Sequence, residues 1–201
     1  SMGTLTGQQI ADRAWTKAQE ATGSSATRWT PAEALWWIND GQREVVNQLP
    51  RANAVRAVPA LVAGTRQTLV ALGLTSGIEV LDVVRNFAAD GTTAGKAITR
   101  RERDYLDELL PDWHSATGTA VEHWFYDERD PKAFYVYPAV TGGRCAEVIY
   151  SALPTDLGSL ASTIALDDTY ANALQFFVLF SFFSKDAKLP NSLQLATGYW
   201  G

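Results

Sequence analysis

The sequence has one cysteine and two histidines in 201 residues, and this scarcity excludes several kinds of site. With Cys145 alone, neither an intramolecular disulfide nor a multi-cysteine metal site can form. His114 and His123 lack the His-x-x-x-His and His-Glu spacings of zinc sites, so each is expected to pack or to form hydrogen bonds. We therefore expect no metal and no cofactor, and we interpret Cys145 as a small buried residue in a strand.

The sequence also has fewer basic than acidic side chains, and it has no long apolar run. The 17 basic side chains are outnumbered by 22 acidic ones, whereas a protein that grips nucleic acid needs a basic excess. The most apolar segment, Phe176 to Phe183, is far shorter than the roughly 20 residues of a membrane span. No signal peptide is apparent, and Ser1-Met2-Gly3 looks like a cloning remnant. These features predict a protein made in a reducing compartment that neither enters a membrane nor holds DNA tightly.

What the chain does contain is typical of a folded globular protein of one or two domains. Its apolar content is 46% and its charged content 19%, with seven Trp, seven Tyr and eight Phe. Such an aromatic content suits either a large core or an interface.

Helices are predicted at both ends of the chain. Thr6 with Gln9, and Thr30 with Glu33 after Pro31, have the spacing of capping boxes. The second helix runs to Pro50, and its amides Asn39 and Gln42 are interpreted as the wet edge of its apolar stripe. Bonds to a neighbouring helix or subunit are the alternative.

The last long helix is predicted from Tyr170 to Lys185, capped by Asp167 or Asp168. It is apolar nearly all round, which places it at the centre of the fold or in contact with neighbours. The first helix is expected to end at Gly23, and a short final helix is expected after Pro190.

The middle of the chain is β-rich. Ala54 to Val62 is predicted as an edge or bulged strand because it contains Pro59, and Ile78 to Asn86 is predicted to pair with Lys96 to Thr99 across Asp90-Gly91. Thr99 with Glu102 suggests a third capping box, which would open a short helix over residues 100–110. Its apolar face would consist of Tyr105, Leu106, Leu109 and Leu110.

Three short antiparallel strands are expected between Val121 and Ala152. Large rings alternate onto both faces of these strands, so each face should be covered by a second sheet, a helix layer or another subunit. The predicted fold class is therefore α+β, with a helical bundle from residues 5–50 and 165–200 and an inserted antiparallel β-rich region over residues 53–160.

No catalytic set emerges from the motifs. The Gly91 to Ala97 stretch resembles a phosphate loop, but it is one residue short and Ala97 replaces the hydroxyl that would hold magnesium, so a hairpin turn explains it better. A pairing of Cys145 with His123 across a sheet has no supporting motif. Asp127, Glu128 and Asp130 could act as paired carboxylates or calcium ligands, but charges on a hairpin turn are the commoner explanation.

The order and spacing of several short blocks resemble the tailed-phage adaptor, or head-to-tail connector, family. The blocks extend over nearly the whole chain: Leu35, Ile38-Asn39-Asp40, Gly64-Thr65-Arg66-Gln67, Leu81 to Asn86, Ile98-Thr99-Arg100, Leu106-Asp107, Pro111 to His114, Asp130-Pro131, Phe134 to Pro138, Pro154, Leu166 to Tyr170 and Lys185-Asp186. Members of that family usually continue beyond the final helix, whereas this sequence stops at Tyr199-Trp200-Gly201, so a shortened connection to a neighbour is expected.

The resemblance implies a non-enzymatic virion structural protein at the head-tail junction, assembled in the host cytoplasm. Such a protein links the portal ring to tail or nozzle proteins, as in podovirus-like tails, and forms a ring of about twelve copies, while a monomer in isolation is compatible with it. DNA passes through the lumen during ejection without specific binding, which suits an acidic balance.

Within this hypothesis, the bundle core and subunit contacts are assigned to Leu35, Ile38, Val45, Leu174, Phe177 and Phe180. The candidate docking aromatics are Trp124, Tyr126, Tyr135 and Tyr137. One alternative is a tail-tube or tail-completion protein. An alternative of another class is a carbohydrate-binding module or glycosidase that uses the aromatic strands.

Overall fold

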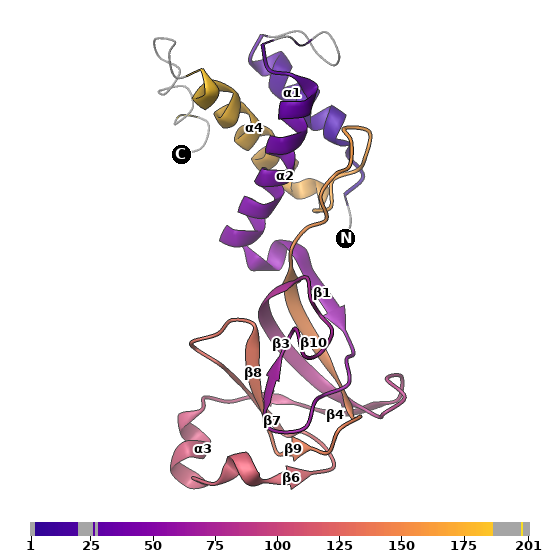
Figure 1. Ribbon diagram of the computed structural model, residues 1–201, viewed down its shortest axis with the longest axis vertical. Coiled ribbons are helices and arrows are strands. Elements are labelled where there is room, and N and C mark those ends of the chain that lie inside the picture. Colours follow the sequence, from indigo (N-terminus) through magenta and orange to yellow (C-terminus); the bar gives the residue numbers. More distant parts are fainter. Residues whose placement is uncertain (1–2, 20–25, 27, 187–197, 199–201) are drawn as a thin grey trace. The chain divides into compact units, whose positions relative to one another are not determined.

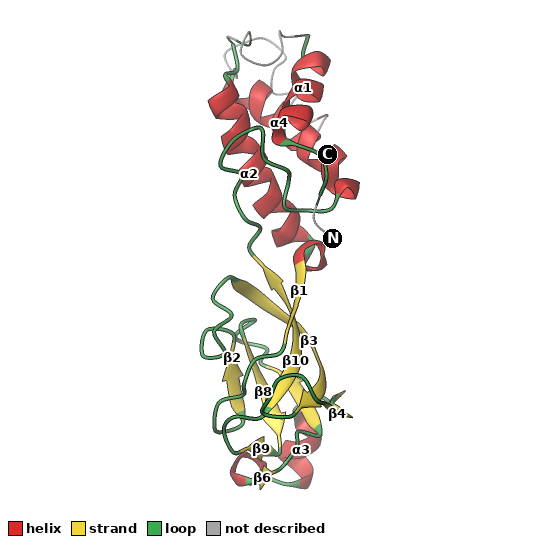
Figure 2. Cartoon of the chain, turned by 90° about the vertical axis from the view of Figure 1, so that its right-hand side faces the viewer, coloured by secondary structure: helices red, strands yellow, loops and turns green. Residues whose placement is uncertain are grey.

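A computed structural model describes residues 3–19, 26, 28–186 and 198, and the chain divides into two compact units. The helical unit combines residues 1–52 with residues 154–201, and the β unit consists of residues 53–153 (Figure 1). The fold is mixed α+β, because N-terminal helices pack with a C-terminal helix and the sheets are inserted between them (Figure 2). This confirms the predicted fold class.

The helical unit contains α1 (Gly7–Lys17), α2 (Pro31–Gln48) and α4 (Ala171–Lys185). Both predicted N-terminal capping boxes are formed: the Thr6 hydroxyl accepts from Gln9 N–H, and the Thr30 hydroxyl accepts from Glu33 N–H. Asp167 caps a short 3-10 helix over Asp168–Tyr170 that leads into α4. The starts of these helices, set by local signals, were therefore well predicted. The predicted end of the first helix at Gly23 was wrong, because α1 already ends at Lys17 with Ala18 as its C-cap. The helix predicted after Pro190 lies outside the described residues.

The core of the helical unit is aromatic. Phe182 of α4 stacks on Trp29 with ring centroids 4.6 Å apart, and Trp15 of α1 lies 6.3 Å from the same ring. The Trp15 indole N–H donates to the Trp29 carbonyl. Helix α2 approaches α4 at Gly41, where a Cβ atom would come within 3.1 Å of the Phe177 ring. The predicted central place of α4 is confirmed, because it contacts both other helices.

The β unit contains ten short strands and one six-residue helix within the described chain. They are β1 (Ala54–Ala57), β2 (Arg66–Thr68), β3 (Gly77–Phe87), β4 (Ala94–Ala97), β5 (Thr99–Arg100), α3 (Asp104–Leu109), β6 (Thr117–Gly118), β7 (His123–Tyr126), β8 (Ala133–Tyr137), β9 (Ala139–Val140) and β10 (Cys145–Ala152). One sheet has the order β1-β10-β3-β4, a second has the order β2-β8-β7-β5, and β6 pairs with β9. Pairing is antiparallel except for β5 with β7 and β6 with β9.

The two four-stranded sheets share one core. Val83 and Val148 of the first sheet belong to the same buried cluster as Trp124 and Phe134 of the second. On the opposite face of the second sheet, Phe125 packs in a separate cluster with Leu106 of α3 and Trp113. The alternating rings between Val121 and Ala152 therefore pack into two cores. One core lies against the other four-stranded sheet, and the second lies against α3 and the turn that follows it. A second sheet and a helix layer were two of the predicted covers for these faces.

Three local predictions need correction. Four strands rather than three lie between Val121 and Ala152: β7 pairs with β8, whereas β9 pairs in parallel with β6, and β10 pairs with β1 and β3. Thr99 caps no helix: it lies in β5, its hydroxyl is bonded to His123, and α3 begins later with Arg103 at an uncapped N-cap. Of the predicted apolar face of that helix, only Leu106 is buried. Thr99, which local spacing predicted as a helix cap, pairs instead with β7 as part of strand β5.

Candidate functional site

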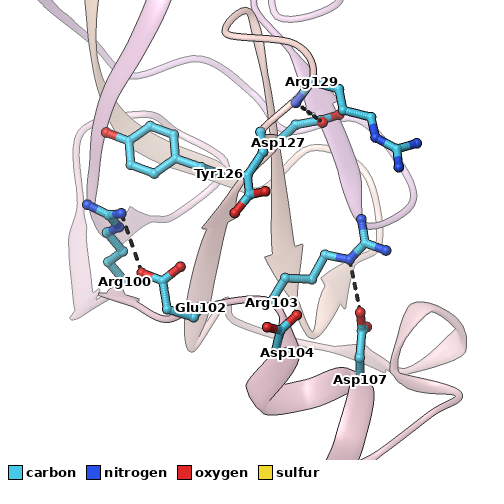
Figure 3. Close-up of a pocket in the computed structure, with 9 residues that line it drawn as sticks. Arg100, Glu102, Arg103, Asp104, Asp107, Tyr126, Asp127 and Arg129 are labelled. Carbon is cyan, nitrogen blue, oxygen red and sulfur yellow. Dashed lines mark hydrogen bonds and ion pairs between the residues drawn. The ribbon is translucent and has the colours of Figure 1, made fainter.

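The best-defined hollow of the β unit is a polar pocket of about 490 Å³ between the β5–α3 segment and the β7–β8 turn (Figure 3). Its lining is mostly charged: Arg100, Glu102, Arg103, Asp104, Asp107, Tyr126, Asp127, Glu128 and Arg129. Three guanidinium groups thus stand among five carboxylates, and none of the lining side chains is a cysteine, serine or histidine.

Ion pairs and ring contacts organise the walls of this pocket. Arg103 Nε lies 3.0 Å from the Asp107 carboxylate, one helical turn away (Figure 3). Arg100 reaches Glu102 at 3.5 Å, and its guanidinium lies 4.5 Å from the centre of the Tyr126 ring. Such exposed pairs contribute little to stability, but they hold the side chains in place around the opening.

One carboxylate of the pocket, Asp107, has an altered pKa. The indole N–H of Trp113 donates to Asp107 at 2.8 Å and, with Arg103, lowers the pKa of that carboxyl below its ordinary value. A general acid for neutral pH needs a raised carboxyl pKa, which is the opposite shift. The lowered pKa therefore gives no support to Asp107 as a general acid.

In the acidic turn Asp127–Asp130, a possible catalytic pair or calcium site by sequence, the carboxylates of Asp127 and Asp130 accept hydrogen bonds from nearby backbone N–H groups. Asp127 accepts from Arg129 N–H, and Asp130 accepts from Lys132 N–H and from Arg66 at 3.0 Å. Among the described residues, no group of three or more His, Cys, Asp or Glu is arranged to hold a metal ion. These carboxylates shape the β7–β8 turn.

The predicted docking aromatics are distributed over both faces of the second sheet. Trp124 is only 1% exposed and lies in the core between the sheets. Tyr126 is half-buried, and its hydroxyl donates to the Leu81 carbonyl at 2.6 Å. Tyr135 and Tyr137 lie half-buried on the opposite face, against the cluster of Trp113 and Phe125. Of the four predicted docking aromatics, the three tyrosines are partly exposed and Trp124 is not.

The predicted bundle residues all lie on α2 and α4 and differ in burial. Ile38, Val45 and Leu174 are buried, whereas Leu35, Phe177 and Phe180 are half-buried. No helix of the described chain is long and apolar enough to cross a membrane.

The histidines and the cysteine have local partners. His114 Nδ1 lies 2.8 Å from the Thr65 hydroxyl, and His123 Nδ1 lies 2.6 Å from the Thr99 hydroxyl. Cys145 is buried at the start of β10, as predicted, and its sulfur lies 4.0 Å from the Gly143 carbonyl. Cys145 and His123 belong to different sheets and are linked by no recorded contact.

The interpretation of Asn39 and Gln42 as wet-edge residues was wrong. Asn39 both donates to the carbonyl and accepts from the N–H of Leu157, while Gln42 is fully buried and accepts from Ala165 N–H at 2.7 Å. These amides bind the loop that precedes α4, because its backbone groups need partners away from water. The two amides interrupting an apolar stripe were the signal available in the sequence.

Two polar clusters were not anticipated. Glu147, only 8% exposed in its side chain, is bracketed on the first sheet by Arg56 and by Arg85, whose Nε lies 2.6 Å away. Asp168 binds the N–H groups of Thr4 and Leu5 and so holds the start of the chain against the loop before α4. A single charge within the apolar run of β10 was the only trace of the first cluster in the sequence.

The family model described as SU10 adaptor protein matches residues 5–201, which is nearly the whole chain. No curated protein matches it. The family match confirms the resemblance drawn from the ordered sequence blocks.

Proposed function

Because this chain belongs to the SU10 adaptor protein family, and thereby to the phage adaptors, we propose that it joins the portal ring to the tail at the head-tail junction. The observation that carries this proposal is the extent of the match, which covers both the helical unit and the inserted β unit. Membership implies a structural, non-enzymatic role.

The surface supports an assembly role. Large apolar side chains that are about half exposed or more include Trp36 on α2 and Tyr105, Leu109 and Leu110 around α3. Surfaces of this kind mark contacts with other proteins. Tyr126, Tyr135 and Tyr137 add partly exposed rings, and Leu35, Phe177 and Phe180 of the bundle are half-buried.

The proposed assembly is a ring of about twelve copies that lines the DNA exit channel and receives tail or nozzle proteins below the portal. The net charge of −5 fits such a conduit, because a basic lumen would retain the phosphates of DNA as it leaves the head. The virion is then its site of action, and assembly takes place in the host cytoplasm.

The test is to mix the full chain with its cognate portal protein and to separate the mixture by size. We expect co-migration with the portal and an added ring below it in electron micrographs. A chain that stays separate from portal rings at all concentrations, with no added ring, would overturn the proposal. Co-migration with a tail component but not with the portal would instead favour a tail-completion protein.

The alternative of a carbohydrate-binding module or glycosidase, with Asp127 or Glu128 as its acids, loses support, because Trp124 is buried and Asp127 accepts a hydrogen bond within the β7–β8 turn. No second function is therefore proposed.

A further inference from the structure

A small knob on the β unit joins apolar and acidic side chains. The knob consists of α3 and its C-terminal turn, and its exposed apolar residues are Tyr105 (48%), Leu109 (61%) and Leu110 (47%). Asp104, Glu108 and Asp112 lie near them in the sequence, are exposed and form no ion pair with any described residue. We name this surface the α3 knob.

The knob is anchored to the β unit although it is exposed. Leu106 is only 2% exposed and packs with Trp113 and Phe125, and the Asp107 carboxylate accepts hydrogen bonds from Trp113 and Arg103. A surface that is anchored before binding loses less conformational entropy in a contact than a free segment does.

Negative charge is concentrated here. Residues 102–112 contain five acidic side chains and one arginine, which gives −5 + 1 = −4 of the net −5 of the whole chain. The rest of the molecule is therefore close to neutral. A partner surface complementary to the α3 knob would therefore be apolar and basic.

The same β unit carries a surface of that kind. A groove of about 360 Å³ beside edge strand β4 is lined by Phe87, Ala88, Ala94 and Ala120, by the two cations Lys96 and Arg144, and by small or neutral polar residues. No acidic side chain lines it, and neither cation forms an ion pair with a described residue. We name this surface the β4 groove.

The two surfaces are separated across the β unit: Figure 1 shows α3 on the left and β4, with the hairpin that joins it to β3, on the right. A single copy therefore cannot join them. Complementary patches on opposite sides of a subunit produce head-to-tail contacts, which close into rings when the rotation allows.

We propose that the α3 knob of one copy docks into the β4 groove of the next copy, with Tyr105, Leu109 and Leu110 against the apolar floor and the knob carboxylates beside Lys96 and Arg144. This inference rests on the proposed ring and goes further by assigning its subunit contact. Charge also sets the polarity, because knob against knob and groove against groove place like charges together, which costs binding energy.

The first experiment traps the contact in the full chain. A mixture of ¹⁴N- and ¹⁵N-labelled chains at high concentration is treated with a carbodiimide, which joins a carboxylate directly to an amine. We expect dimers of mixed label in which Lys96 is linked to Asp104, Glu108 or Asp112. Because a monomer in isolation is compatible with the ring, the same reaction is also run with cognate portal rings present. The proposal is overturned if no mixed dimer forms in either reaction, or if the mixed dimers link other residues.

The second experiment reverses charge on each surface. Glu108→Lys with Asp112→Lys, and separately Lys96→Glu with Arg144→Glu, should each lower the yield of mixed dimers by about tenfold or more. Dimer yield for these variants is measured by light scattering and by an amine-independent photo-cross-linker, since the reactive groups themselves have changed. All four positions are exposed, so the fold should survive, which circular dichroism checks.

Mixing the two charge-reversed variants tests the proposed contact most directly. In the mixture a basic knob meets an acidic groove and an acidic knob meets a basic groove, so association should return towards the wild-type level. Asp82→Lys and Lys132→Glu, exposed charges elsewhere on the β unit, are the matched controls and should change nothing. If the mixture stays dissociated, or if the controls weaken association equally, the proposed contact is wrong. Portal binding by the wild-type chain is scored separately, so a failure here is distinguishable from a failure of the adaptor proposal.

Discussion

Asn39 connects α2 to the loop before α4 through both ends of its amide. Its Nδ2 donates to the Leu157 carbonyl at 3.2 Å, and its Oδ1 accepts from Leu157 N–H at 2.8 Å. Asn39→Ala would leave both half-buried backbone groups of Leu157 unpaired, so we expect the free energy of unfolding to fall by about 1–3 kcal/mol.

Urea unfolding of the full chain measures this loss. Asn47→Ala, on the exposed face of the same helix, makes the same change in helix propensity and should stay within about 0.5 kcal/mol of the wild type. Equal effects at the two positions would show that the amide of Asn39 does not support the loop.

From the lowered pKa of Glu147 we predict that the free energy of unfolding depends on pH. The Arg56 guanidinium, helped by Arg85, holds the pKa of the Glu147 carboxyl below its ordinary value of 4.5 despite the opposing effect of burial. Since the folded state then binds a proton less readily than the unfolded state, this contribution is complete above the ordinary pKa. It is lost as the pH falls through the lowered folded pKa.

Glu147→Gln removes the charge and leaves Arg56 and Arg85 without their shared carboxylate. We expect a loss of about 1–2 kcal/mol at about pH 7, kept small because both arginines are partly exposed, and a smaller loss at about pH 4. Urea midpoints at the two pH values measure it. Glu79→Gln on β3, a residue with no recorded ion pair, is the control, and a Glu147 effect that is independent of pH would contradict the assignment.

Residues could be predicted from the sequence where their partners lie close along the chain. The hydroxyls of Thr6 and Thr30 bind N–H groups three residues away, so spacing alone identified both caps. Asn39 finds its partner 118 residues away, and Glu147 finds Arg56 and Arg85 at separations of 91 and 62. No local pattern carries that information, because these partners are brought together only by the fold.

At the scale of elements, the contact between α2 and α4 depends on Gly41. A Cβ atom there would lie 3.1 Å from a ring carbon of Phe177 and 3.4 Å from Leu174 Cδ2. Gly41→Val adds a branched side chain at this crossing, so we expect the helices to separate slightly and the free energy of unfolding to fall by about 1–3 kcal/mol.

Chemical denaturation followed by helical circular dichroism measures this change, with Asn47→Val on the exposed face of α2 as the control. Gly41→Ala should have a weaker effect, since the gain in helix propensity of about 1 kcal/mol opposes the crowding. If Gly41→Val is as stable as the control, the close approach of the two helices is wrong.

Helices and strands were predicted best where the apolar pattern of the segment alone determines its place in the fold. Helix α4 is apolar all round and is central in its unit, as expected. Strand β10 was recognised from its apolar run, but that run is buried on both faces and does not say which strands lie beside it. At α3 the apolar residues of a short helix were read as buried, whereas three of them face outward as the knob. An exposed docking surface and a core face have the same composition, so sequence alone does not separate them.

At the scale of the whole molecule, the two ends of the β unit meet. Ala54 of β1 pairs with Ser151 of β10, and Asn53 Nδ2 donates to the Ala152 carbonyl at 2.8 Å. The β unit also has its own buried core, which its two sheets share. A unit whose ends are adjacent and whose core is internal satisfies the requirements of an independently folding domain.

We therefore predict that residues 53–153, produced alone, fold cooperatively. Trp113 and Trp124 are each 1% exposed, so their fluorescence reports the loss of both β-unit cores. With 153 − 53 + 1 = 101 of the 201 residues, the fragment should unfold in urea with a denaturant dependence of roughly half the value summed over the full chain. Val148→Asp, which buries an unpaired charge at a fully buried position, should abolish the transition. A fragment that unfolds without a cooperative transition, and that Val148→Asp leaves unchanged, would show that the β unit needs the helical unit in order to fold. In that case residues 53–153 would be a structural subdivision only, and variants of the α3 knob and the β4 groove could be interpreted only in the full chain.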